Sequence, residues 1–330
     1  MKVLFIGGTG VISSASTVLA SERGMHLTLL NRGQAGRPVP AGVETVRADI
    51  RNPASVESAL GGRTFDAVVD WVCFTAGHAE TDLRLFAGKT GQFVFISSAS
   101  AYQTPPSHLP VTESTPLVNP VWAYSRDKIA CEEVFMRAHR DGGFPAVIVR
   151  PSHTYDRTLL PTHGRYTDID RMRKGKKVVV HGDGSSLWTL THHADFAVGL
   201  VGLLGNPRAL GEAFHVTSDE SLTWDQIVRI LGRAAGVEPK ITHIPSELIA
   251  AYFPDWGDSL LGDKTHSMIF DNSKIRRMVP DFNPSIPFSR GAEEILAWYD
   301  ADPKRRETDP VYERTLDQMI EAYESAFPKG

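Results

Sequence analysis

Short apolar runs alternate with segments of helical periodicity along the first two-thirds of the chain. The runs that we expect to form strands are Val3–Ile6, Leu27–Leu30, Val43–Val46, Ala67–Val72, Phe93–Ile96, Ala146–Val149 and Ala213–Val216. Continuous apolar strands that alternate with helices are typical of a parallel sheet covered by helices on both faces. The pattern therefore predicts an α/β protein with a doubly wound, Rossmann-like parallel sheet.

Helix and loop signals place the elements between these strands. We expect helices from Ser13 to Glu22, from Trp122 to about His139 and from His192 to about Leu204. Thr223 and Gln226 have the spacing of a capping box and should start a further helix. The proline-rich stretch 102–121 is expected to be a loop, because proline cannot continue a strand.

The periodicity weakens after Pro151, and this change suggests two domains. We assign residues 1–165 together with about 187–217 to the sheet domain. Residues 166–186 and 218–330 carry short helices broken by prolines. We expect these segments to form a smaller C-terminal substrate lobe over the carboxyl edge of the sheet.

A glycine turn follows the first strand directly, at Gly7-Gly8-Thr9-Gly10, and a helix pattern begins after it. Strand, glycine turn and helix is the arrangement in which backbone N–H groups at a helix N-terminus bind a pyrophosphate. The third glycine of the usual fingerprint is replaced by Ser13. Serine is small enough to keep helix and strand close, but it should loosen their packing slightly.

Two further features carry chemistry. Serines 97, 98 and 100 follow the fifth strand, at the edge where a parallel sheet delivers its ligands. Tyr124 and Lys128 stand four residues apart and so share one face of the expected helix. A nearby ammonium favours the phenolate and should lower the pKa of Tyr124 from its ordinary value, which suits proton transfer near neutral pH. Taken alone the Tyr-x-x-x-Lys spacing is weak, since it often arises by chance.

The glycine turn, the serine cluster and Tyr124-x-x-x-Lys128, in this order, resemble the extended short-chain dehydrogenase/reductase family, here in an atypical branch. The resemblance covers roughly residues 1–155. It implies a nicotinamide site in a Rossmann domain, with Tyr124 as proton donor or acceptor and Ser98 polarising the reacting C–O bond. It also implies that Lys128 holds the nicotinamide ribose and lowers the pKa of Tyr124, and that the protein is a homodimer.

The same resemblance implies a set of binding residues. The cofactor contacts expected from it are Gly7, Thr9, Gly10, Val11, Ile12, Asn31, Arg32, Asp49, Ile50, Val72, Lys128, Pro151 and His153. The substrate contacts expected from it are Ser98, Ser100, Tyr102, Tyr124, His153 and Trp188.

Departures from the family pattern reduce the number of reactions and substrates that fit this chain. Ala99 and Ser100 stand where the sugar-nucleotide 4,6-dehydratases have an Asp-Glu pair, so that elimination lacks its acid and base. Trp188 stands where the epimerases have an arginine for the nucleotide diphosphate. An indole cannot neutralise a diphosphate, although it can stack on a base or sugar ring, or simply lie in the core. His153 stands where a substrate-contacting asparagine often lies.

The end of the second strand bears on the choice of nicotinamide. NAD enzymes of this fold usually have a carboxylate there, which accepts hydrogen bonds from the ribose 2′-OH. This chain has Asn31 followed by Arg32, and a guanidinium can pair with a 2′-phosphate. We therefore expect NADP(H) to be favoured, with NAD(H) possible.

Composition excludes several function classes. The formal charge of −4 gives no general attraction to nucleic acid or to an anionic membrane. No apolar run approaches the length of a membrane helix. Cys73 and Cys131 lie in apolar surroundings, so we expect reduced core thiols in the cytoplasm, no disulfide framework and no metal site.

The sequence thus predicts an NAD(P)-dependent oxidoreductase or epimerase that acts on a hydroxyl or keto carbon of a sugar-like small molecule. An epimerase would retain its cofactor and a reductase would release it. The alternative is a non-catalytic RNA-associated or cofactor-sensing protein of the same fold, which the complete Ser98, Tyr124 and Lys128 set disfavours.

Overall fold

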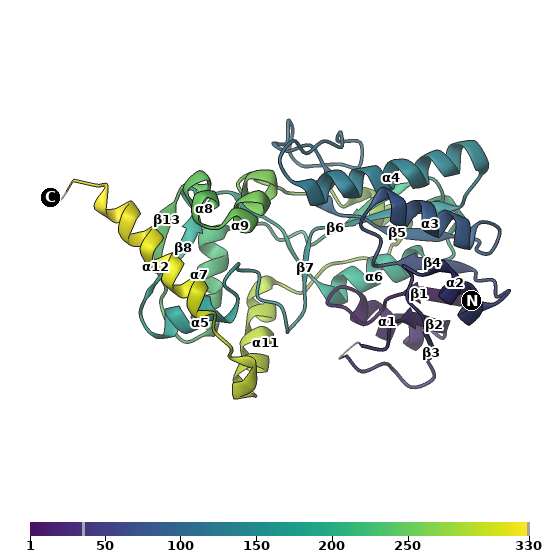
Figure 1. Ribbon diagram of the computed structural model, residues 1–330, viewed down its shortest axis with the longest axis horizontal. Coiled ribbons are helices and arrows are strands. Elements are labelled where there is room, and N and C mark those ends of the chain that lie inside the picture. Colours follow the sequence, from purple (N-terminus) through teal and green to yellow (C-terminus); the bar gives the residue numbers. More distant parts are fainter. Residues whose placement is uncertain (35–36, 329–330) are drawn as a thin grey trace.

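A seven-stranded parallel sheet forms the centre of the protein, as a computed structural model of residues 1–34 and 37–328 shows (Figure 1). Its order is β3-β2-β1-β4-β5-β6-β11. The strands are β1 (Lys2–Ile6), β2 (His26–Asn31), β3 (Glu44–Arg47), β4 (Ala67–Asp70), β5 (Phe93–Ile96), β6 (Ala146–Pro151) and β11 (Ala213–Val216). The order reverses between β1 and β4, which is the point where doubly wound sheets bind dinucleotides. The predicted Rossmann-like fold is confirmed.

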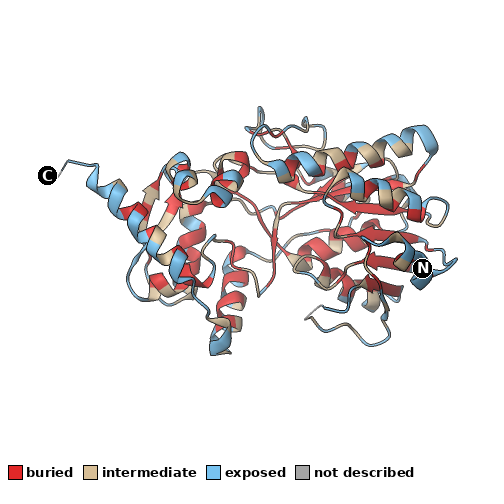
Figure 2. Ribbon diagram, in the orientation of Figure 1, coloured by how far each residue is buried: buried red, intermediate tan, exposed pale blue. Residues whose placement is uncertain are grey.

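Helices cover both faces of this sheet (Figure 2). One face carries α1 (Ser13–Glu22), α6 (His193–Leu203) and α10 (Ser273–Met278), and the other carries α2 (Pro53–Leu60), α3 (Ala76–Phe86) and α4 (Ala123–Gly142). Alternate strand residues enter opposite cores: Val3 and Phe5 pack with α6, whereas Leu4 and Ile6 pack with α3 and α4. This double burial explains why the central strands β1, β4 and β5 are almost entirely apolar, whereas the edge strand β3 is polar and mostly exposed.

The remaining elements form a second group, which we call the C-terminal lobe; it lies at the left of Figure 1. There β8 (Lys177–His181) pairs in parallel with β13 (Lys240–Ile244). The helices of this lobe are α5 (Tyr166–Arg173), α7 (Trp224–Ala234), α8 (Ser246–Tyr252), α9 (Pro254–Ser259), α11 (Phe288–Asp300) and α12 (Pro310–Ser325). The predicted capping box starts α7, with Thr223 and Gln226 bonded reciprocally. The exact division of the chain into domains stays a prediction.

The remaining elements are short. They are η1 (Ala99–Ala101), β7 (His153–Tyr155), β9 (Leu187–Trp188), β10 (Leu190–His192), η2 (Pro207–Ala209), β12 (Leu222–Thr223), η3 (Leu260–Lys264) and η4 (Pro303–Arg305). Residues 102–121 form the expected loop between η1 and α4. Within residues 1–34 and 37–328, no helix combines the length and the hydropathy needed to cross a membrane.

Candidate active site

The glycine turn between β1 and α1 has a backbone that only glycine adopts easily. Gly7 and Gly8 have φ angles of 104° and 97°, and a Cβ on Gly8 would lie 2.7 Å from Cδ2 of Leu29. The Ser13 hydroxyl accepts a hydrogen bond of 2.8 Å from the amide of Gly10. The serine that replaces the third glycine therefore ties the turn to the start of α1.

A cavity of about 680 Å³ opens over this turn. Its wall contains the predicted cofactor residues Gly7, Thr9, Gly10, Val11, Ile12, Asn31, Arg32, Asp49, Ile50 and Val72. The backbone amides at the start of α1 suit a pyrophosphate, and the apolar residues along the wall suit flat rings. This cavity, which we call the cofactor pocket, fits a dinucleotide.

A second cavity of about 290 Å³, the reaction pocket, lies at the carboxyl ends of β5 and β6. It brings together the predicted residues Ser98, Ser100, Tyr124, Pro151, His153 and Trp188. Pro151 and His153 were expected to contact the cofactor, and His153 also the substrate; both line the reaction pocket, as the last residue of β6 and the first of β7. Their contact with a cofactor stays a prediction.

Tyr124 is half-buried in this pocket, next to Trp122, with ring centroids 5.0 Å apart. Burial raises the pKa of Tyr124 and the charge of Asp263 adds to this, whereas the Ser98 hydroxyl acts in the opposite direction. The Ser98 hydroxyl lies 2.9 Å from that of Ser100, to which Ser125 donates a bond of 2.8 Å. At neutral pH the phenol of Tyr124 therefore carries its proton, which suits a proton donor.

Lys128 is buried below Tyr124 and faces away from solvent. Its ammonium donates to the carbonyl oxygens of Cys73 at 2.7 Å and Ile96 at 2.9 Å, and it lies 5.9 Å from the ring centroid of Tyr124. The sequence predicted that this ammonium lowers the pKa of Tyr124, yet that pKa is raised. The reason is that burial raises the pKa of the phenol, whereas the Lys128 ammonium makes its hydrogen bonds to two backbone carbonyls and not to the phenol.

Trp188 and His153 form one unit on the opposite wall. The indole N–H of Trp188 donates to Nδ1 of His153 at 3.2 Å. Burial, helped by the charge of Lys264, lowers the pKa of His153 to about 3. His153 is therefore a neutral acceptor, and it fixes the plane of the indole against the cavity.

Tyr102 was expected to contact the substrate, and the structure contradicts this prediction. Its side chain is fully buried, its hydroxyl lies 3.0 Å from Nδ1 of His215, and the guanidinium of Arg150 lies over its ring. The chain turns at η1, between Ser98 and Tyr102, so that the serines face the pocket and the tyrosine faces the core.

Comparisons with known proteins agree with this geometry. The sequence model of the NAD dependent epimerase/dehydratase family matches residues 81–216. A curated 2'-dehydrokanamycin reductase from Streptomyces kanamyceticus is 28% identical over 302 residues, which cover 90% of this chain and 84% of that protein. The predicted resemblance to the extended short-chain dehydrogenase/reductase family is confirmed. The chloroplast stem-loop binding protein of 41 kDa b from Arabidopsis thaliana is 24% identical over 261 residues, or 73% of this chain and 65% of that protein.

Solved structures share the fold across the whole molecule. The epimerase Mth375 from Methanothermobacter thermautotrophicus superposes with a TM-score of 0.76 and 19% identity, covering 92% of this chain and 94% of that one. The UDP-glucuronic acid 4-epimerase from Bacillus cereus, in complex with UDP-glucuronic acid and NAD, gives a TM-score of 0.72 and 19% identity, covering 91% and 99%. At this identity the likeness concerns the fold alone.

Two charged residues of the reaction pocket, Asp263 and Lys264, were not predicted from the sequence. Asp263 and Lys264 end η3, a single π-helical turn of the C-terminal lobe, and both line the pocket. Burial raises the pKa of Asp263 to about 6, and the charge of Lys264 opposes the rise. The Lys264 ammonium lies 5.3 and 5.7 Å from the rings of Trp122 and Trp188. No motif marks these residues, because only the packing of η3 against Asn119 and Trp122 brings them to the site.

A third cavity of about 310 Å³ continues from the reaction pocket into the C-terminal lobe, and His153 and Lys264 line both. Its wall includes Arg165, Trp224 and Trp256. Together the two cavities offer room for a substrate larger than a single sugar ring.

Proposed function

We propose that the protein is an NAD(P)-dependent reductase that acts on a keto or hydroxyl carbon of a sugar-like small molecule. The observation that carries this proposal is the position of Ser98 and Tyr124. Both line the reaction pocket, and Ile96, at the end of the strand that leads to Ser98, lines the cofactor pocket. The family match supports a nicotinamide dinucleotide as cofactor, and the relative that is a reductase supports the direction of the reaction.

In the proposed reaction the cofactor and the protein side chains have separate roles. The nicotinamide supplies or accepts a hydride when bound. Ser98 donates a hydrogen bond to the substrate oxygen and polarises its bond to carbon. Tyr124 gives that oxygen its proton, and the raised pKa keeps the phenol protonated until the substrate binds. Trp122 and Trp188 provide flat apolar surfaces for a sugar ring.

The experiment that tests this function measures cofactor release together with turnover. The purified protein should hold little nicotinamide and should oxidise NADPH when a keto glycoside is added. A tightly retained cofactor with no net oxidation would show an epimerase. Absence of nicotinamide binding, with binding of a structured RNA, would support the RNA-associated alternative. The expected homodimer is a part of the proposal that sedimentation can check.

We further propose that the substrate lacks a nucleoside diphosphate. Trp188 stands in the place of the arginine that would bind this group, and Asp263 offsets the charge of Lys264 within the same pocket. Burial lowers the pKa of His153 to about 3 and that of His181 to about 4, so these rings add no positive charge at neutral pH. We therefore expect UDP- and dTDP-sugars to bind at least about tenfold more weakly than an uncharged keto glycoside, the factor expected for a difference of about 1.4 kcal/mol.

Titration calorimetry with a panel of nucleotide sugars and uncharged glycosides measures this difference. Arg165, which lines the adjoining cavity, is a guanidinium that could reach a diphosphate. Tight binding of any nucleotide sugar that is lost in Arg165→Ala would contradict the proposal and identify the residue responsible. Arg276, which pairs with Asp219, serves as the control position.

The preference for NADP(H) is tested at Arg32. This residue is exposed at the mouth of the cofactor pocket, and the side chain of neighbouring Asn31 accepts a bond from Gly33. Arg32→Ala should shift the ratio of affinities from NADPH toward NADH by roughly 1–3 kcal/mol, because a charge-assisted pair with the 2′-phosphate is lost. Fluorescence titrations of wild type and variant with both cofactors measure the shift.

Arg47 provides a matched control for this experiment. It is exposed and packs near Gly33, yet it lies outside the described wall of the cofactor pocket. Arg47→Ala should leave the ratio unchanged. A wild type that prefers NADH, or an equal shift in both variants, would remove Arg32 as the residue that reads the 2′-phosphate.

A further inference from the structure

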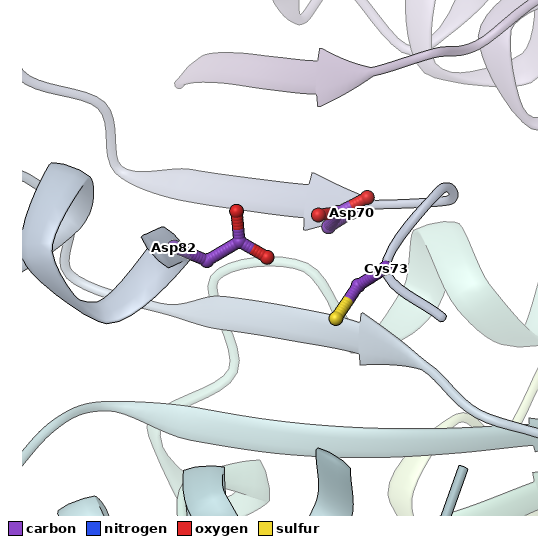
Figure 3. A group of neighbouring side chains, drawn as sticks. All are labelled: Asp70, Cys73 and Asp82. Carbon is purple, nitrogen blue, oxygen red and sulfur yellow. The ribbon is translucent and has the colours of Figure 1, made fainter. Parts of the chain in front are cut away.

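Three buried side chains meet beside the cofactor pocket (Figure 3). Asp70 is the last residue of β4, Cys73 lies in the loop that follows, and Asp82 lies on α3. One carboxylate oxygen of each aspartate and the sulfur of Cys73 lie within 4.8 Å of one another, and all three residues are 0% exposed. The fold brings these groups together from a strand end, a loop and a helix.

The carboxylates of this cluster lack partners. Both oxygens of Asp82 and Oδ2 of Asp70 have no hydrogen-bond partner within residues 1–34 and 37–328. Only Oδ1 of Asp70 accepts a bond, from the amide of Val72 at 2.6 Å. A buried carboxylate without compensation costs several kcal/mol. The cluster therefore requires a bound proton or a bound cation.

The two nearest cationic side chains do not supply this compensation directly. Arg51 donates to the carbonyl oxygen of Val72, and Lys128 donates to the carbonyl oxygens of Cys73 and Ile96. Across the described part of the chain, neither forms an ion pair with Asp70 or Asp82. The charges of Arg51 and Lys128 therefore act on the two carboxylates from a distance, and no positive group lies between the three side chains in the described part of the chain.

A proton alone satisfies the cluster poorly. One shared proton pairs one oxygen of each carboxyl group. The second oxygen of Asp82 is still left without a partner, and the Cys73 thiol lies 4.0 Å from the carbonyl oxygen of Thr75 and 3.9 Å from the sulfur of Cys131. A divalent cation would engage both carboxylates and the sulfur at once.

We propose that Asp70, Cys73 and Asp82 bind a structural zinc ion. Zinc accepts sulfur and carboxylate ligands in tetrahedral geometry with bonds of about 2.0–2.3 Å, whereas magnesium and calcium prefer oxygen alone. The three ligand atoms lie within 4.8 Å of one another, so bonds of this length require them to move closer together around the ion. Binding releases the protons of the Cys73 thiol and the Asp82 carboxyl to solvent.

The charges around the cluster support a zinc ion. Two carboxylates and one thiolate carry three negative charges, one more than the two positive charges of zinc. The cationic side chains of Lys128 and Arg51 interact with the cluster and can balance this excess negative charge. The ion would also fix the loop that carries Cys73. Val72 and Phe74, on either side of Cys73, line the cofactor pocket, and the Cys73 carbonyl holds Lys128. The site would thus stiffen the pocket wall without contacting substrate.

The test is metal analysis of the intact protein. The protein is expressed in zinc-supplemented medium and purified without chelators, and zinc is measured by plasma mass spectrometry. We expect about one zinc per chain in the wild type and less than about a tenth of this in Asp82→Asn and Cys73→Ser. Cys131→Ser is the matched control, since its sulfur lies 3.9 Å from that of Cys73 but outside the proposed ligand set. It should keep its zinc.

Cobalt provides a readout that does not depend on how well the variants fold. Wild-type protein refolded with Co²⁺ should show a thiolate-to-cobalt absorption band, and Cys131→Ser should show the same band. Wild type that contains no zinc after purification and gives no cobalt band on refolding would overturn the proposal and leave a shared proton as the explanation. Full zinc content in both Asp82→Asn and Cys73→Ser would overturn it as well, because the metal would then bind elsewhere.

Discussion

Replacing Tyr124 with phenylalanine is expected to lower kcat at least about a hundredfold while cofactor affinity stays nearly unchanged. In the reaction pocket the Tyr124 phenol is the group that we propose to give the substrate oxygen its proton. The ring of phenylalanine keeps the contact with Trp122, 5.0 Å away between centroids, so the shape of the pocket is preserved. Steady-state kinetics and cofactor titration on the same preparations separate the two effects.

Tyr102→Phe is the matched control for this prediction. It also removes a buried phenol hydroxyl, but one that bonds His215 outside the reaction pocket. We expect it to lower stability modestly and to leave kcat within about threefold of wild type, since it touches no reacting atom. Equal losses in both variants, or full activity in Tyr124→Phe, would show that Tyr124 is not the proton donor.

The raised pKa of Tyr124 adds a pH dependence to the same prediction. Because a phenol can donate only while it is protonated, the rate of reduction should stay constant through neutral pH. It should fall as the pH rises through the raised pKa. A rate that already falls between pH 6 and 8 would indicate that Lys128 lowers this pKa in the complex with cofactor.

The sheet could be predicted from sequence because both of its faces are buried. The central strands are apolar at consecutive positions, so their runs stand out against the amphipathic helices between them, whereas the edge strand β3 is mostly exposed. Strand ends were less certain: the fourth run was expected to reach Val72 but ends at Asp70, whose side chain bonds the Val72 amide and turns the chain. Local side-chain bonds of this kind leave little trace in a hydrophobic pattern.

The site could be predicted only where the chain brings its residues together locally. Ser98 follows β5, and Tyr124 lies on the first turn of α4, so both reach the pocket from the sheet itself. Asp263 and Lys264 come from a lobe distant in sequence, through a π-helical turn whose position depends on tertiary packing. The sequence predicted no metal site at Cys73, because the spacing of Asp70, Cys73 and Asp82 matches no ligand motif and tertiary packing alone brings the three side chains together.

A buried ion pair below the reaction pocket is expected to be the most costly polar contact to break. Arg150 on β6 donates to both oxygens of Glu132 on α4, at 2.9 and 2.5 Å, and both side chains are almost fully buried. Ser97, which precedes Ser98, donates to the same carboxylate at 2.5 Å. Glu132→Ala would leave the Arg150 guanidinium buried and unpaired, so we expect a loss of about 3–5 kcal/mol in the free energy of unfolding.

Urea unfolding of Glu132→Ala beside Glu44→Ala measures this cost against a surface reference. Glu44 pairs with Arg63 at 2.6 Å, but the two side chains are 51% and 39% exposed, so its loss should cost less than about 1 kcal/mol. The double variant Glu132→Leu with Arg150→Met should recover most of the stability, because no charge is then left without a partner. If Glu132→Ala costs no more than Glu44→Ala, the pair is not the element that holds α4 against β6. The alignment of Ser98 with Tyr124 would then depend on apolar packing alone.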